Sequence, residues 1–314
     1  MKPFGNNLRV FCNILLGAIG LSLATLSPLS GNEAAAPSKV VFSVENAIFL
    51  TDTNQAAPRE IARGYDPEIS PRGDQVAFTF YTEEGGRMIA VIPLATGEAR
   101  LFSSIPGENS YGPRWAPDGT SLLFNHWEEA RGNWVLGFLS LEDESFRILA
   151  PEQEGLYSPF WSAEGASVFA QDLDSLYQID VERGVVMGKS PLFSVLGDTI
   201  ASSAVHFSIS PDGSKWLFDA EIEGSPEWQE LDIPLLSAIF LYTPKDGKTR
   251  RLTDNTICAL HPAWLPGGEE FIFSGYTPED AARDTFPFSI FRQHLENPIP
   301  ELLLTRGDSP SCSR

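Results

Sequence analysis

Two histidines occupy the same place in a recurring segment and are the strongest candidates for chemistry in this sequence. His206 opens one copy of the segment and His261 opens the next, while Asp66 stands at the equivalent place of an earlier copy. Imidazole nitrogens and carboxylate oxygens are common ligands of divalent metal ions. If the fold brings these side chains together, His206 and His261 are the expected metal ligands. The alternative interpretation is a set of polar residues lining a wet pore.

An acidic segment follows the fourth copy and is a second candidate. Residues 221–232 carry five carboxylates and lengthen that repeat unit. The spacing does not match a calcium loop of the Asp-x-Asp-x-Asp-Gly type. We interpret the segment as a solvated surface loop, and the alternatives are calcium binding or a partner-docking loop with Trp228 as its anchor. The residues that would contact a partner are Glu223, Glu227, Trp228, Glu230 and Asp232.

Enzyme signatures are absent from the sequence. It has no Gly-x-Ser-x-Gly elbow, no His-Glu-x-x-His pair, no phosphate-binding glycine loop and no dinucleotide fingerprint. We therefore assign no catalytic residues and predict a non-enzymatic protein. The alternative is a metal-dependent lyase or hydrolase that uses His206 and His261.

The repeat that carries these residues predicts short strands. Its copies each end on a glycine, and these glycines recur at intervals of 46 to 55 residues, at Gly73, Gly119, Gly165, Gly213 and Gly268. In Pro117-Asp118-Gly119, proline presets the first turn position and glycine takes the positive backbone angle that ends the turn. A strand of apolar residues follows each glycine, and an alternating strand comes next. A period of this length built from strands is typical of a propeller or a stacked repeat.

The two ends of the sequence complete each other. Lys39–Arg63 supplies a second, third and fourth strand without a first one, and residues 308–313 resemble a first strand that then stops. Pairing the C-terminal strand with the N-terminal strands removes exposed sheet edges. Five whole units and one shared unit predict an all-β, six-bladed β-propeller over residues 38–314.

The repeat resembles that of the TolB-type β-propeller family, whose copies read Pro-x-Trp-Ser-Pro-Asp-Gly before a buried strand. Copies such as Pro113–Gly119 and Pro159–Gly165 carry this pattern, and the resemblance covers about residues 38–314. TolB carries a further N-terminal α/β domain, for which we find no room here, so we expect a lone propeller. The resemblance implies a binding role toward a peptidoglycan-associated lipoprotein or another envelope assembly, and some lyases of the family hold a metal in the channel through histidines.

The resemblance also implies that the first strand of each blade is the innermost one and begins near the central channel. The channel-mouth candidates are then Asp66, Ser158, His206, His261 and Ser309, with Gly112 at the remaining place. Trp115, Trp161 and Trp264 share another repeat position. We predict that they pack between blades, because large aromatic side chains fill the wedge between sheets.

Charge and the N-terminus predict where the protein acts. Residues 1–36 combine Lys2 and Arg9 with the apolar run 10–26, the layout of a signal peptide or signal anchor followed by a short linker. We expect a periplasmic or otherwise exported protein, anchored in the inner membrane if the leader is not cleaved. The formal charge of −20 argues against nucleic-acid binding. We predict a monomer with a protein or peptide partner in the envelope, no membrane contact beyond an N-terminal anchor, and no cofactor apart from the divalent ion considered above.

Overall fold

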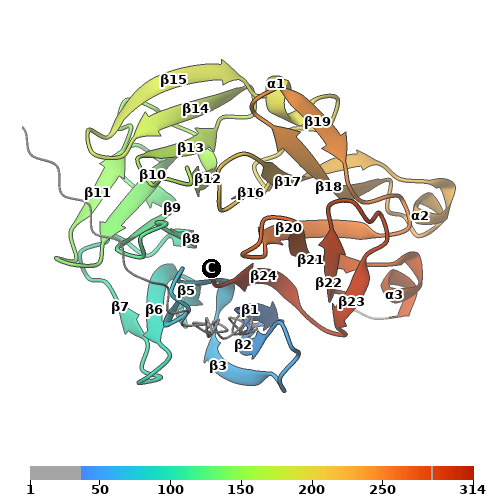
Figure 1. Ribbon diagram of the computed structural model, residues 1–314. Helices are drawn as coiled ribbons and strands as arrows, with labels where there is room; N and C mark the ends of the chain where they lie inside the picture. Colours follow the sequence, from blue (N-terminus) through green and yellow to red (C-terminus); the bar gives the residue numbers. More distant parts are fainter. Residues whose placement is uncertain (1–36, 284–285) are drawn as a thin grey trace, which may run out of the picture. The chain divides into compact units, whose positions relative to one another are not determined.

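The computed structural model describes residues 37–283 and 286–314, which form six blades around a central channel (Figure 1). The leader predicted in residues 1–36 lies outside the described residues. Among the described residues, none of the helices has both the length and the apolar character needed to cross a membrane. The predicted all-β, six-bladed propeller is confirmed.

Each blade is a sheet of four antiparallel strands. The first blade combines both ends of the described chain, and its strands are β24 (Asp308–Cys312), β1 (Lys39–Val44), β2 (Ala47–Asp52) and β3 (Arg59–Arg63). The second and third blades are β4 (Tyr65–Ile69), β5 (Gln75–Tyr81), β6 (Arg87–Pro93), β7 (Arg100–Leu101), and β8 (Ser110–Trp115), β9 (Ser121–Glu128), β10 (Asn133–Ser140), β11 (Phe146–Leu149). The remaining three are β12 (Tyr157–Trp161), β13 (Ser167–Gln171), β14 (Ser175–Asp180), β15 (Val185–Pro191); β16 (Phe207–Ile209), β17 (Trp216–Glu223), β18 (Leu235–Thr243), β19 (Lys248–Arg251); and β20 (Cys258–Trp264), β21 (Glu270–Tyr276), β22 (Ser289–His294), β23 (Glu301–Leu304).

The turn between the first two strands of a blade follows the predicted chemistry. Gly119 has a φ of 74° and donates its N–H to the carbonyl of Ala116 at 2.9 Å. The carboxylate of Asp118 accepts the backbone N–H of Thr120 at 2.9 Å. The left-handed angle at the glycine reverses the chain, so β9 returns alongside β8.

The ring is closed by β24. Its register pairs Ser311 with Val41 and Cys312 with Val40 in an antiparallel ladder. Lys39 and Ser313 extend the ladder, since the N–H of Ser313 donates to the carbonyl of Lys39 at 2.9 Å. The closure predicted from the two incomplete ends is therefore confirmed, and β24 covers the edge of β1 that would otherwise be exposed.

Three tryptophans join neighbouring blades. Trp115, Trp161 and Trp264 are only 5 to 8% exposed. Each indole N–H donates to a backbone carbonyl of the preceding blade, at 2.9 Å to Glu68, 3.0 Å to Arg114 and 3.0 Å to Ser208. The aromatic ring fills the wedge while its polar edge is paired, as buried indoles require. The predicted packing role is confirmed.

The structure adds elements that the sequence analysis did not predict. The fourth strand of the blade that begins with β12 is β15, for which no candidate segment was identified. Three short helices of the described residues also connect strands, namely α1 (Phe193–Leu196), α2 (Pro226–Glu230) and α3 (Pro278–Arg283). Of these, α2 lies inside the acidic segment that was interpreted as a loop, and Glu221 and Glu223 belong to β17.

Candidate functional site

The rim of the channel is built from a repeated backbone bulge. The residue before the repeat proline has a positive φ at Asp66 (50°), Gly112 (64°), Ser158 (52°), His261 (53°) and Ser309 (49°). The pairing of each of these strands with its neighbour shifts register close by. A left-handed residue costs about 1–2 kcal/mol except at glycine, and it turns the strand and re-aims its side chains. His206 precedes Phe207 rather than proline and is not among the positive-φ residues.

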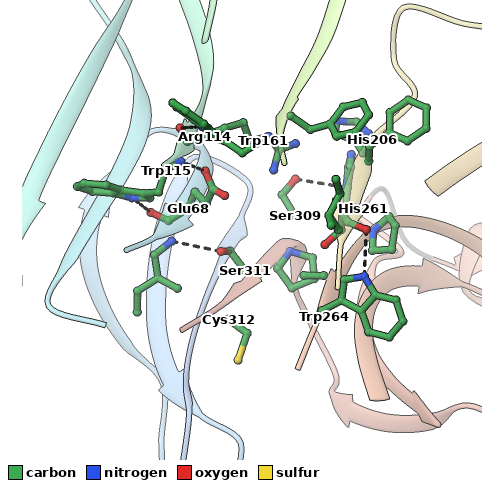
Figure 2. A pocket seen from close by; sticks show the side chains of 18 of the residues that line it. Glu68, Arg114, Trp115, Trp161, His206, His261, Trp264, Ser309, Ser311 and Cys312 are labelled. Atoms are coloured by element: carbon green, nitrogen blue, oxygen red, sulfur yellow. Dashed lines mark hydrogen bonds between the residues drawn. The ribbon is translucent and has the colours of Figure 1, made fainter. Parts of the chain in front are cut away.

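These strands enclose a pocket of about 150 Å³ at the channel mouth (Figure 2). Four of the predicted channel-mouth residues line it, namely Asp66, His206, His261 and Ser309. Ser158 is not among the lining residues. Its hydroxyl donates to the carbonyl of Ser203 at 3.1 Å, so its side chain is held by a neighbouring loop.

The side chains of His206 and His261 lie side by side at the pocket. Their ring centroids are 4.3 Å apart and the rings are almost perpendicular, at 86°. Each ring is oriented by a carboxylate at Nδ1. Asp219 lies 3.2 Å from Nδ1 of His206, and Asp308 lies 2.8 Å from Nδ1 of His261.

The pKa values of the two imidazoles are shifted in opposite directions. Burial, and then the neighbouring His261, lower the pKa of His206 below its usual value. Burial also acts to lower the pKa of His261, but the hydrogen bond to Asp308 and the charge of that carboxylate outweigh it and raise this pKa. His261 therefore binds a proton more readily than His206 does.

Asp219 is a site residue that the sequence analysis missed. Its side chain is 4% exposed, and its carboxylate accepts the backbone N–H of His206 at 2.6 Å and that of His261 at 2.8 Å. It thus links two blades at the point where both histidines stand. The signal that could have found it is its place six residues after the closing glycine, where the other blades hold buried polar residues as well: Thr79, Asn125, Gln171 and Ser274.

Glu68 and Arg114 also line the pocket, and Figure 2 shows Glu68 in the wall that faces the histidines. Burial raises the pKa of Glu68 to about 7, against the opposing pull of Arg114 and of the N–H of Trp115. That N–H donates to Oε2 of Glu68 at 2.7 Å. Because its pKa lies close to neutrality, Glu68 is only partly ionised at pH 7.

Glu68 should make stability depend on pH. Its pKa is higher in the folded state than the ordinary 4.5, so its contribution is fully present below pH 4.5 and is lost as the pH rises through about 7. The loss is at most about 3 kcal/mol, and smaller in practice because channel water screens a half-buried group. Glu68→Gln should therefore be more stable than the wild type at pH 8 and nearly equal to it at pH 4.5.

Urea unfolding at the two pH values checks this expectation. The matched control is Glu98→Gln, since Glu98 is exposed. The control should keep the wild-type dependence of stability on pH. If Glu68→Gln keeps it too, the assigned pKa of Glu68 is wrong.

A serine, a histidine and an aspartate meet at Ser309, His261 and Asp308, but not in the arrangement of a hydrolase. The hydroxyl of Ser309 lies 3.3 Å from Nδ1 of His261, the same nitrogen that Asp308 approaches. In a catalytic triad, the serine and the aspartate bond to opposite ring nitrogens, so that the imidazole can pass a proton between substrate and serine. This geometry does not support nucleophilic catalysis.

Two imidazoles and a carboxylate that could hold a metal ion lie close together in the site. Ligand atoms of His206, Asp219 and His261 lie within 4.8 Å of one another. However, Asp219 already accepts two backbone N–H groups, Asp308 favours the protonated form of His261, and the charge of Arg114 acts on His206. As it stands, this donor set fits hydrogen bonding better than a divalent cation. The ion stays a prediction.

The acidic segment does not present its tryptophan to solvent, so that part of the docking hypothesis is wrong. Trp228 is 0% exposed and packs against Leu236 and Cys258. Its indole N–H donates to the carbonyl of Asn255 at 2.6 Å. The helix α2 directs the indole ring into the core, because burying its apolar surface is more favourable in free energy than leaving that surface in water. The acidic side chains remain on the surface, at Glu223, Glu227, Glu230 and Asp232.

No protein-family model and no curated protein sequence matches this chain. Solved structures do match its fold. TolB from Acinetobacter baumannii superimposes with a TM-score of 0.64 at 16% identity, over 88% of this chain and 66% of that one. A putative TolB from Agrobacterium tumefaciens gives 0.58 at 15% identity, over 87% and 90%.

An oligogalacturonate lyase in complex with manganese gives a TM-score of 0.52 at 18% identity, over 81% of this chain and 69% of that one. Identities this low carry the fold and not the activity. The chain spans slightly less than two thirds of the Acinetobacter protein. In fold, residues 37–314 are thus a TolB-like six-bladed β-propeller.

Proposed function

We propose that this protein is an exported, non-enzymatic binding module that holds a segment of a protein partner at its channel mouth. The observation that carries the proposal is the pocket itself, which rests on a closed ring and is rimmed by polar side chains on rigid first strands. Sites built on strands hold their groups more exactly than sites on loops.

The size of the pocket favours a side chain or a chain end as its occupant. At about 150 Å³ it is smaller than the roughly 300–1,000 Å³ typical of sites for cofactors and drug-sized ligands. The neighbouring rim would then contact the rest of the partner segment. Export through the leader expected in residues 1–36, a place in the cell envelope and a monomeric state belong to this proposal.

Photo-cross-linking in the native host tests the proposal. A photoreactive amino acid at Asp66, which is exposed and lines the pocket, should form a covalent adduct with a distinct protein. The matched control is the same amino acid at Glu98, which is exposed and does not line the pocket. The proposal fails if position 66 gives no adduct, or if both positions give the same adducts.

A metal-dependent lyase or hydrolase is the second candidate. It is favoured by the proximity of His206, Asp219 and His261, and by a fold neighbour whose structure contains manganese. Elemental analysis of the purified protein decides between the two candidates. A stoichiometric transition metal that is lost in His206→Ala would support the enzyme, and its absence from both proteins would remove that candidate.

A further inference from the structure

The carboxylates that line the pocket, Asp66 and Glu68, and those that hold its histidines, Asp219 and Asp308, each have hydrogen-bond donors of their own. Asp219 accepts the N–H groups of His206 and His261. Asp308 lies against the imidazole of His261 and accepts the N–H of Ser309 at 2.7 Å. Asp66 accepts the hydroxyl of Thr79 at 2.9 Å, and Glu68 accepts the N–H of Trp115.

Arg114 is different, because its guanidinium has no such partner. Within residues 37–283 and 286–314, no carboxylate oxygen lies within 4.0 Å of a guanidinium nitrogen of Arg114, the distance that defines an ion pair. No acceptor among these residues is hydrogen-bonded to this side chain either. The residue is half-buried on β8 and lines the pocket. Its backbone is held in place, since the indole of Trp161 donates to its carbonyl at 3.0 Å. Its charge acts on groups on both sides of the pocket, because it contributes a lowering effect to the pKa values of Glu68 and His206.

The unmatched charge of the pocket is therefore positive. A guanidinium withdrawn from bulk water without a partner favours an anion, and its planar fork matches a carboxylate with two parallel hydrogen bonds. Arg314 also lines the pocket and adds a second guanidinium. Glu68 does not neutralise Arg114 completely, since it is only partly ionised at pH 7.

We propose that Arg114 anchors a carboxylate of the partner segment inside the channel-mouth pocket. This inference rests on the proposed function, because it names the chemistry that the pocket recognises in its partner. A carboxylate is favoured over a phosphate group because Asp66 and Glu68 also line the cavity. Their negative charges oppose a dianion more strongly than a monoanion.

A carboxylate can come from an acidic side chain or from the end of a polypeptide, and small probes separate the two. N-acetylglycine mimics a chain end, while the α-amide of N-acetylglutamate mimics an acidic side chain. N-acetylglycinamide is the uncharged control, and inorganic phosphate is the competing anion. The tighter of the two carboxylate probes identifies the source.

The four histidines of the chain provide the readout through their imidazole signals in nuclear magnetic resonance. His206 and His261 line the pocket, while His126 is buried inside its blade and His294 ends β22. At least one carboxylate probe should shift His206 and His261 with a dissociation constant of about 1–10 mM, and should leave His126 and His294 unmoved. Arg114→Gln should weaken this binding at least about tenfold, and Arg114→Lys should weaken it less.

Arg183→Gln is the matched control, because Arg183 is exposed and pairs with Asp180 away from the pocket. It should bind the probes as the wild type does. Unchanged signals of His126 and His294 show that each variant is folded. The inference is overturned if neither carboxylate shifts His206 and His261, if Arg114→Gln binds as tightly as the wild type, or if phosphate binds more tightly than both carboxylates.

The probe experiment tests the role of Arg114, and the cross-linking experiment tests the protein partner, so one proposal can be wrong while the other stands. Cross-links from position 66 without carboxylate binding would leave the binding module standing and remove the role of Arg114. Carboxylate binding without cross-links would support the chemistry of the pocket and remove the protein partner.

Discussion

Deleting residues 308–314 is expected to abolish the folded state. The deletion removes β24, which pairs with β1 and covers the inner edge of the first blade. Val40, Val41 and Phe42, all at most 2% exposed, would lose their cover on that side. Full burial of one such side chain contributes about 1.5–3 kcal/mol, and the lost ladder hydrogen bonds add about 1 kcal/mol each. Together these losses match the roughly 5–15 kcal/mol by which folded domains are stable.

Circular dichroism and urea unfolding check this expectation. The shortened protein should lack a cooperative transition, whereas deletion of Arg314 alone should leave one, because that residue follows β24. A shortened protein that unfolds cooperatively at nearly the wild-type urea concentration would contradict the role of β24 in closing the ring.

Asp219→Ala should cost about 3–5 kcal/mol of unfolding free energy. The substitution leaves the N–H groups of His206 and His261 without their acceptor in a place that is almost closed to water. Asp219→Asn keeps one acceptor oxygen but turns an N–H₂ group toward the second donor, so it should cost about 1–3 kcal/mol. Both changes should also lower the pKa of His206, since the charge of Asp219 acts to raise it.

Urea unfolding measures the two costs, and imidazole signals followed against pH measure the titration of His206. Asp198→Ala is the control, because Asp198 is exposed, and it should change stability by no more than about 0.5 kcal/mol. If Asp219→Ala is as stable as this control, the carboxylate does not hold the two blades together.

The fold could be predicted because the same turn and strand pattern occurs in every copy of the repeat. Each closing glycine marks a turn, and each turn marks the two strands that it joins. The incomplete N-terminal and C-terminal units form a complete blade only by pairing with each other. The one missing strand, β15, shows where this reasoning stops. Its sequence contains Gly188 and ends in Lys189-Ser190-Pro191, and five of its seven residues are exposed, so neither composition nor alternation marks it as a strand.

The site was predicted in position more fully than in chemistry. His206 and His261 share a repeat place, so their meeting could be predicted from the period alone. The place of Asp219, six residues after a closing glycine, marks it as a buried polar residue, but its contact with His261 of the next blade cannot be read from that spacing. The roles of Glu68 and Arg114 likewise depend on contacts between blades. Trp228 shows the opposite error, because an aromatic residue among five carboxylates suggests exposure, while the short helix α2 turns it into the core.

The bulge shared by five first strands has a consequence for how such proteins diversify. Because the backbone adopts one shape at aspartate, glycine, serine and histidine alike, the side chain there can be exchanged without rebuilding the blade around it. Each of these positions can then be substituted independently of the others. A single substitution can change which ligand the channel mouth binds, while the blades keep their structure.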